Sequence, residues 1–166
     1  MKISTQKITM ASLFAALVCI ATMLIQIPSP LKGYLNLGDC VVLAAGWMLS
    51  PVYGFLAAGI GSALADIFSG YVMYAPATFL IKGLMSVTAY YGFYTMYRKI
   101  GEFSARLLGG IAAEILMIMG YFWFESVLYG MGASALNIPA NAVQGTAGLA
   151  LGLVLVKALK KNRIYH

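Results

Sequence analysis

The sequence predicts an all-α membrane protein with six transmembrane helices and both termini in the cytoplasm. Of its 166 residues, 61% are hydrophobic and only 10% are charged, and the mean hydropathy is +0.86. A soluble domain carries roughly 25% charged residues, so this chain has too few charges to cover a globular surface. A chain of 166 residues holds about six spans of roughly 20 residues. We therefore expect residues 1–166 to form a single integral membrane domain.

Six apolar segments follow one another along the chain, and each is expected to form one helix. The expected ranges are 8–27, 39–49, 52–68, 74–97, 105–129 and 138–159. The first is stopped by Pro28 and Pro30, because proline interrupts a helix. The second and third are separated by Ser50 and Pro51, which predicts a tight helical hairpin in place of one long span. The last three are distinguished by polar stripes.

Lysine and arginine indicate the orientation. They gather before the first span, between the fourth and fifth, and after the sixth: Lys2 and Lys7, then Arg98, Lys99 and Arg106, then Lys157, Lys160, Lys161 and Arg163. With six spans these three groups lie on one side, which should be the cytoplasm. Only Lys32 falls on the other side. This bias accounts for the net charge of +6, so the charge predicts no nucleic-acid partner.

Each of the last three predicted helices carries one stripe of polar residues. The stripes are Tyr74, Thr78 and Lys82; then Glu114, Tyr121 and Glu125; then Asn137, Asn141 and Gln144. Their spacings of three, four and seven place each set on one helix face. Hydrocarbon offers no hydrogen bonds, so a polar stripe must face a partner or a cavity. Three stripes facing inward predict a pocket for a small polar molecule.

The sequence contains no recognisable catalytic constellation. The single histidine is the last residue, His166, which excludes a histidine-based triad or metal cluster. No G-x-x-x-x-G-K-[ST] loop is present, so the chain itself should not hydrolyse ATP. Glu114 and Glu125 are separated by roughly 16 Å of helix rise, too far for a carboxylate pair acting on one bond. We predict neither an enzyme nor a metal or cofactor site.

Small residues form stripes on two of the first three helices. Gly54, Ala58, Gly61 and Ala65 follow the third helix, and Ala11 and Ala15 follow the first. Such stripes let helix backbones approach closely in lipid. Two interpretations remain open for the first helix, packing within this chain or docking of another membrane protein.

Short motifs recur in order along nearly the whole chain. They are Asn36-Leu37-Gly38-Asp39, Gly46, Ser50-Pro51, Gly54, Gly59-Ile60-Gly61-Ser62-Ala63-Leu64-Ala65-Asp66, Gly70-Tyr71, Tyr74-Ala75-Pro76, Thr78-Phe79-Leu80-Ile81-Lys82-Gly83 and Pro139-Ala140-Asn141-x-x-Gln144-Gly145. Together with the six-helix layout, they resemble the substrate-binding S components of energy-coupling factor (ECF) vitamin transporters.

The resemblance implies a multi-pass protein of a prokaryotic cell membrane that binds a vitamin or its precursor near the outer side. S components work with a membrane-embedded T component and two ATPases, so ATP hydrolysis is expected in partner chains. Ala11 and Ala15 match the family motif that contacts the T component. The family's ligand site draws on helices four to six and on the loop after helix one.

The candidate ligand contacts combine the stripes with that loop. They are Tyr34, Asn36, Tyr74, Thr78, Tyr121, Glu125, Asn137, Asn141 and Gln144. Aromatic rings stack on a ligand ring, amides donate and accept, and a carboxylate accepts with charge-assisted strength. The competing interpretations are that Asn141 and Gln144 bond across helices and that Glu125 lies exposed at the outer interface.

Three other charges within the membrane region are expected to be structural. An isolated charge is costly there, so Asp66 and Lys82 should pair with each other or with an end group. Glu114 should form an ion pair or a bond between helices. Ligand contact by Lys82 is the alternative.

The candidate contacts also restrict the substrate. They lack the cations that a multiply charged ligand needs, which favours a small neutral or weakly basic ring. Hydroxymethylpyrimidine is the first choice and pyridoxine the second. A riboflavin-type S component, a self-sufficient carrier for small solutes and a ligand-free membrane scaffold remain as alternatives.

Overall fold

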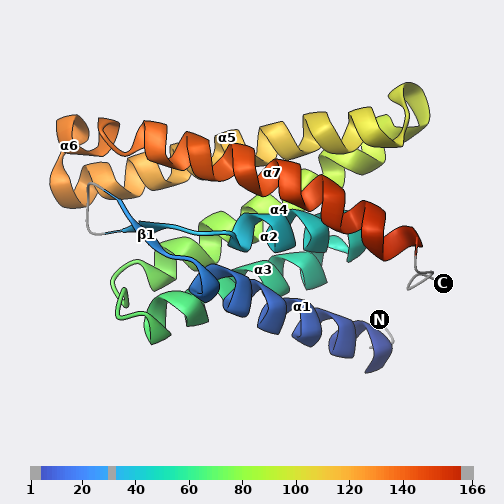
Figure 1. The fold of residues 1–166 in the computed structure, drawn as a ribbon, viewed down its shortest axis with the longest axis horizontal. Coiled ribbons are helices and arrows are strands. Elements are labelled where there is room, and N and C mark those ends of the chain that lie inside the picture. The colour runs from blue at the N-terminus through green and yellow to red at the C-terminus, as the bar shows by residue number, and fades with distance from the viewer. Residues whose placement is uncertain (1–4, 30–32, 162–166) are drawn as a thin grey trace.

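The computed structural model describes residues 5–29 and 33–161 (Figure 1). It contains six main helices of 11 to 28 residues, which follow the predicted order and lie close to the predicted ranges. The elements are α1 (Thr5–Leu24), β1 (Ile27–Pro28), β2 (Tyr34–Leu35), α2 (Gly38–Met48), α3 (Pro51–Phe68), α4 (Ala75–Ile100), α5 (Glu102–Tyr129), α6 (Met131–Ala135) and α7 (Ile138–Lys161). The helical fold class is confirmed, and the five-residue α6 is an addition within the connection expected between the last two helices.

The first predicted helix ends earlier than expected. It was predicted to reach Ile27, but α1 stops at Leu24, and Ile27 with Pro28 forms a short antiparallel strand against Tyr34 and Leu35. The residue before a proline is disfavoured in the helical region and prefers extended backbone. Pro28 therefore ends the helix before its own position and starts a hairpin, which we call the β1–β2 hairpin.

The predicted turn between α2 and α3 is confirmed. Leu49 closes α2 in an extended conformation (φ −102°, ψ 162°), and Pro51 is the first residue of α3. Proline suits the first helical position, where its missing N–H is no loss. The two helices consequently fold back on each other after a single tight turn.

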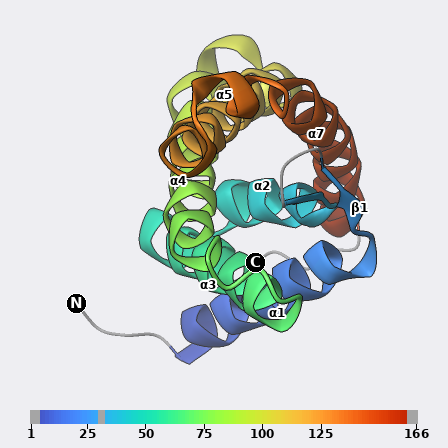
Figure 2. The same cartoon turned by 90° about the vertical axis from the view of Figure 1, so that its left-hand side faces the viewer.

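The short helix α2 lies in the middle of the bundle. Nine of its 11 residues are buried, and it contacts α1, α3, α4, α5 and α7. In Figure 2, α4, α5 and α7 curve around α2, with α1 and α3 on the other side. A Cβ at Gly46 would collide with the backbone carbonyl of Ser86 on α4. Glycine at this position therefore permits the close approach that brings α2 into the centre.

The small-residue stripe of α3 packs within the chain. Gly54, Ala58, Gly61 and Ala65 are all buried. A Cβ at Gly61 would collide with the backbone carbonyl of Ala15 on α1. The stripe therefore holds α1 against α3, as expected for helices that associate through backbone contact.

In the described part of the chain, four helical segments are long and apolar enough to cross a membrane: Thr5–Leu24, Pro51–Phe68, Glu102–Tyr129 and Met131–Lys160. The apolar helix α2 has only 11 residues, and α4 contains three charged side chains, Lys82, Arg98 and Lys99. Large apolar side chains point outward, among them Leu24 on α1 and Val127 on α5, which are 73% and 85% exposed. An apolar outer surface of this kind is suited to lipid.

The two ends of the bundle differ in chemistry. At one end, on the right of Figure 1, lie the start of α1, the α4–α5 junction and the end of α7. We call it the basic end, because it holds Lys7, Arg98, Lys99, Lys157 and Lys160. The opposite end holds the β1–β2 hairpin, the α3–α4 connection and α6 (Figure 1). Of the remaining predicted charges, Lys2, Lys32 and Arg163 lie outside the described residues.

Candidate ligand-binding site

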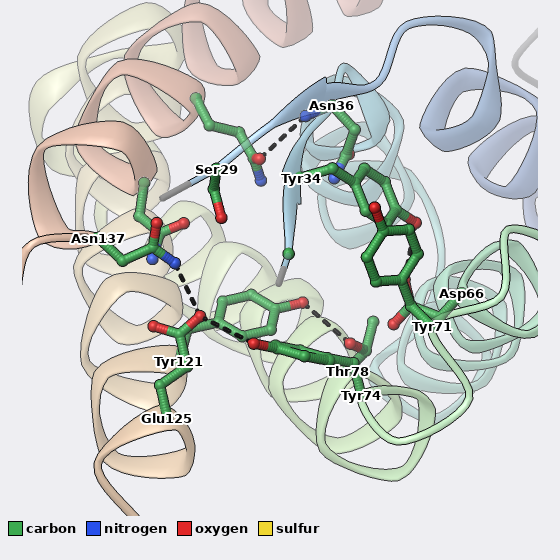
Figure 3. Close-up of a pocket in the computed structure, with 13 residues that line it drawn as sticks. Ser29, Tyr34, Asn36, Asp66, Tyr71, Tyr74, Thr78, Tyr121, Glu125 and Asn137 are labelled. Carbon is green, nitrogen blue, oxygen red and sulfur yellow. Dashed lines mark hydrogen bonds between the residues drawn. The ribbon is translucent and has the colours of Figure 1, made fainter. Parts of the chain in front are cut away.

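A pocket opens at the end of the bundle opposite the basic end, and all nine predicted contact residues line it (Figure 3). Its lining consists of Ser29, Gly33, Tyr34, Asn36, Asp66, Tyr71, Tyr74, Thr78, Tyr121, Glu125, Asn137, Asn141 and Gln144. The space between them is about 410 Å³, counting the part open to solvent. The part of this space that a water-sized sphere can occupy is only about 30 Å³, so a ring ligand needs the lining side chains to move outward.

Each wall of the pocket comes from a different element. The first turn of α4 supplies Thr78, the last two turns of α5 supply Tyr121 and Glu125, and the start of α7 supplies Asn141 and Gln144. The β1–β2 hairpin and the residues after it form another wall. The predicted stripes therefore converge because helix ends at the same side of the bundle face one another.

The carboxylate of Glu125 is the centre of one polar cluster. Asn137 Nδ2 donates to Glu125 Oε1 at 2.7 Å, and the Tyr74 hydroxyl approaches the same oxygen at 3.5 Å. Glu125 is 2% exposed, so the interpretation that it lies at the outer interface is wrong. Among the described residues, Glu125 Oε2 and Asn137 Oδ1 have no hydrogen-bond partner. Buried acceptors without partners carry a free-energy cost, which a ligand donor would relieve.

Asp66 forms a second polar cluster across the pocket. The Tyr34 hydroxyl donates to Asp66 Oδ1 at 2.7 Å, and the Tyr34 and Tyr71 rings lie 4.7 Å apart. Burial, reinforced by the Asp66 carboxyl, raises the pKa of Tyr34, so its hydroxyl keeps the proton that it donates. Asp66 Oδ2 has no hydrogen-bond partner in the described part of the chain. This free acceptor adds to the two of the Glu125 cluster, and Figure 3 shows tyrosines around the site.

Lys82 does not pair with Asp66, so the first of the two predicted pairings is wrong. Lys82 Nζ forms a buried ion pair with Asp39, the second residue of α2. The reason is depth, since Lys82 lies about two turns further along α4 than Tyr74, whereas Asp66 belongs to the last turn of α3 at the pocket. Lys82 is absent from the pocket lining, which disfavours the alternative of direct ligand contact.

Gln144 connects the pocket to that ion pair. Its Nε2 donates to Asp39 Oδ2 at 2.7 Å, and its Oε1 accepts from the backbone N–H of Asn36 at 3.0 Å. Asn36 Oδ1 in turn accepts from the backbone N–H of Gly38 at 2.9 Å. The amide of Gln144 therefore bonds across elements, as one interpretation expected, while also lining the pocket.

Glu114 belongs to neither cluster. Both of its carboxylate oxygens lack a hydrogen-bond partner among the described residues, so the expected ion pair or helix bond is wrong. The side chain is buried against α7, where a Cβ at Gly145 or Gly148 would meet its oxygens at 2.8 and 3.3 Å. The glycines leave room for the carboxyl but offer it no donor side chain.

The remaining predicted contacts fill the wall between α4, α5 and α7. The Tyr121 hydroxyl donates to Thr78 Oγ1 at 3.1 Å, and the Tyr121 ring lies 5.5 Å from Lys82 Nζ. Asn141 lies on α7 one turn before Gly145 and is half-buried. Four tyrosines line the pocket in all, which gives it stacking surfaces for a ring.

The electrostatic character of the pocket is acidic. Within the residues that the structure describes, its lining contains two carboxyl groups, Asp66 and Glu125, and no lysine, arginine or histidine. An anionic ligand would therefore meet no compensating charge in a poorly solvated site, which is unfavourable. A neutral or weakly basic ring that carries hydroxyl or amino donors matches the free acceptors on both clusters.

Four lining residues were not predicted as contacts: Ser29, Gly33, Asp66 and Tyr71. Asp66 was assigned a structural role, although its place at the end of the third helix, on the side of the pocket, was a usable signal. Tyr71 follows Gly70, which adopts φ 84° at the turn after α3. Loop residues such as Ser29 and Tyr71 belong to no helical period, so no stripe could identify them.

The comparisons with known proteins agree with this geometry. A model of the family described as "ECF-type riboflavin transporter, S component" matches residues 2–161. An uncharacterized protein from Pyrococcus woesei is 36% identical over 146 residues, which cover 87% of this chain and 95% of that relative. Among solved structures, the S component of a bacterial ECF transporter is similar at a TM-score of 0.75 and 24% identity, over 96% of this chain and 98% of that one. At that identity the likeness shows a common fold.

Proposed function

This chain belongs to the family of ECF-type transporter S components, and we propose that it captures one small ring-containing vitamin or vitamin precursor in the pocket at the end opposite its basic end. As a member of that family it is a membrane-embedded transporter subunit and not an enzyme, and it associates with a T component and ATPases. The observation that carries the proposal is the convergence of nine predicted polar residues on one buried pocket.

Hydroxymethylpyrimidine is the proposed ligand, with pyridoxine next. Both are small rings that carry hydroxymethyl groups, and the first also carries an amino group. Their donors suit the free oxygens of Glu125, Asn137 and Asp66, and their rings suit the four pocket tyrosines. The described part of the lining holds no cation, which supports a ligand without phosphate or carboxylate.

Riboflavin is the second candidate, because the name of the matching family model refers to riboflavin transporters. Its ribityl hydroxyls are donors that could also reach Glu125 and Asp66. A three-ring ligand needs more room than a single ring, and the space that a water-sized sphere can occupy is about 30 Å³, so either ligand needs the lining to move outward and riboflavin needs the larger movement. Riboflavin would therefore require the β1–β2 hairpin or neighbouring side chains to move outward.

We place all six long helices across a prokaryotic cell membrane, with the basic end in the cytoplasm. Lysines and arginines favour the cytoplasmic side, and Figure 1 shows the α1 start, the α4–α5 junction and the α7 end together. The pocket then faces outward, where a scavenged vitamin is encountered. The short α2 is compatible with this placement because the other helices surround it.

We also assign the T-component contact to the α1 face that carries Ala11 and Ala15. Both side chains are half-buried and line an apolar groove shared by α1 and α3. Ala15 already packs against Gly61 within the chain. Packing within the chain and docking of another protein are nevertheless compatible, because the groove beside this contact is open to a partner.

Calorimetric titration of the purified, detergent-solubilised chain tests the proposal. Hydroxymethylpyrimidine, pyridoxine, thiamine and riboflavin are titrated separately into ligand-free protein. We expect one-to-one binding of hydroxymethylpyrimidine in the nanomolar range, about −12 kcal/mol, and much weaker binding of riboflavin. Tight riboflavin binding would replace the ligand assignment, whereas no binding of any of the four to folded protein would contradict the proposed vitamin class.

A further inference from the structure

A groove at the basic end has the composition of a lipid-binding site. It lies between the start of α5 and the end of α7, two helices that diverge toward this end in Figure 1. Its lining consists of Glu102, Phe103, Arg106, Leu153, Val154, Lys157 and Lys160. The open space is about 940 Å³, including the part that faces the surroundings. This groove is separate from the ligand pocket, with which it has no lining residue in common.

Positive charge is in excess in this groove. Glu102 is the single carboxylate of the lining, and it pairs with Arg106 at 2.6 Å and with Lys160. Lys157 forms no ion pair with any residue that the structure describes. Three cations against one carboxylate give the described lining a net charge of +2. The groove therefore attracts an anion.

The cation on α5 is held in place before any ligand arrives. Arg106 is only 8% exposed, and its guanidinium lies 4.7 Å from the centre of the Phe93 ring on α4. Its Nε has no hydrogen-bond partner among the described residues. A charge fixed by an aromatic face and one shared carboxylate can receive an anion with little loss of conformational entropy.

The polar and apolar residues are arranged in layers along α7. Lys157 and Lys160 lie in the last turns of the helix, and Leu153 and Val154 lie about one turn deeper. A phospholipid has the same order, with its phosphate at the membrane surface and its acyl chains below.

We propose that this groove binds one anionic phospholipid, its phosphate between Lys157, Lys160 and Arg106 and its acyl chains along Leu153 and Val154. The apolar depth of the groove favours a lipid over a free anion, because a small anion would leave that surface unfilled. Binding needs the basic end to lie at a membrane surface, and it is independent of which vitamin the pocket takes.

Native mass spectrometry with phosphatidylglycerol or phosphatidylcholine, titrated into the purified chain in detergent, measures the binding. Lys157→Gln combined with Lys160→Gln removes two groove charges. Arg98→Gln combined with Lys99→Gln removes the same charge at the same end, from exposed residues outside the groove lining. At 0.15 M salt, where the screening length is about 8 Å, distant charges contribute little.

We expect phosphatidylglycerol to bind the wild-type chain in preference to phosphatidylcholine. Each groove lysine should contribute about fivefold to the affinity, so the groove double variant should bind roughly 25-fold more weakly. The control double variant should change by less than about twofold under this screening. Equal losses in both variants, or no preference for the anionic lipid, would overturn the proposal.

Two further experiments test whether the groove prefers a lipid to a free anion and whether Glu102 competes with the bound phosphate. Millimolar inorganic phosphate should not displace phosphatidylglycerol, and full displacement would show a simple anion site instead. Glu102→Gln removes the competing carboxylate and should tighten phosphatidylglycerol binding. Weaker binding in this variant would mean that the groove cations serve only their internal ion pairs, contrary to the proposal.

Discussion

Replacing Glu125 by glutamine tests the part of the pocket that the ligand is expected to need most. The amide keeps the size of the side chain and an acceptor oxygen for Asn137, whose Nδ2 now donates at 2.7 Å. It removes the negative charge, and it replaces the free oxygen Oε2 by a group that cannot accept. A ligand donor that bonds to Oε2 therefore loses its charge-assisted partner.

The expected loss follows from the strength of the two kinds of bond. A hydrogen bond to a charged group contributes about 1.5–3 kcal/mol, and one between neutral groups about 0.5–1.5 kcal/mol. The amide nitrogen offers no neutral bond in exchange, so the full contribution of the charged bond, about 1.5–3 kcal/mol, is lost and Kd rises about 13- to 160-fold. Calorimetric titration of the purified Glu125→Gln variant with the wild-type ligand measures this ratio.

Glu114→Gln is the matched control. It makes the same chemical change on the same helix, at a buried carboxyl that does not line the pocket. We expect its Kd to stay within about twofold of the wild-type value, since ligand contacts are unchanged. An unchanged Kd in Glu125→Gln, or an equal loss in both variants, would refute the assignment of Glu125 as a ligand acceptor.

Three further predictions concern other parts of the molecule. Lys82→Met leaves Asp39 buried without its cation, so thermal unfolding in detergent should show a loss of about 3–5 kcal/mol; an unchanged Tm would contradict a structural role. Tyr34→Phe removes the hydrogen bond to Asp66 but keeps the ring, and titration should show Kd rising about 2- to 13-fold; tighter binding would argue against the present geometry. Ala11→Leu fills the groove beside α1 and should reduce ATP-driven uptake by the assembled transporter, while the lone chain binds its ligand normally; a loss of ligand binding by the lone chain would count against the assigned docking face.

Helical periodicity identified seven of the residues that line the pocket, those of the three polar stripes. Thr78 and Tyr121 lie on different helices, yet both point inward and form a hydrogen bond. The spacing of polar residues sets the face of each helix, and the cost of polar groups in hydrocarbon requires those faces to meet. Four of the six long helices also have the length and composition of membrane spans.

Pairing between elements could not be predicted in the same way. Lys82 has the correct period for the pocket but lies too deep in the bundle, where α2 brings Asp39 to it. Glu114 shares the period of Glu125, yet the roughly 16 Å of helix between them takes it out of the pocket. Periodicity reports a direction around the axis, while depth and partners depend on how the helices pack.

Analysis of small molecules that remain bound during purification tests the central claim most directly. Wild-type protein is purified without added ligand, denatured and analysed by mass spectrometry, with Glu125→Ala prepared in parallel as the background. We predict that the wild-type protein retains one compound, a ring that carries hydroxyl or amino groups and no phosphate or carboxylate. The Glu125→Ala variant should retain much less of it. Stoichiometric retention of an anionic compound, or equal retention of the same compound by both proteins, would contradict the proposed pocket chemistry.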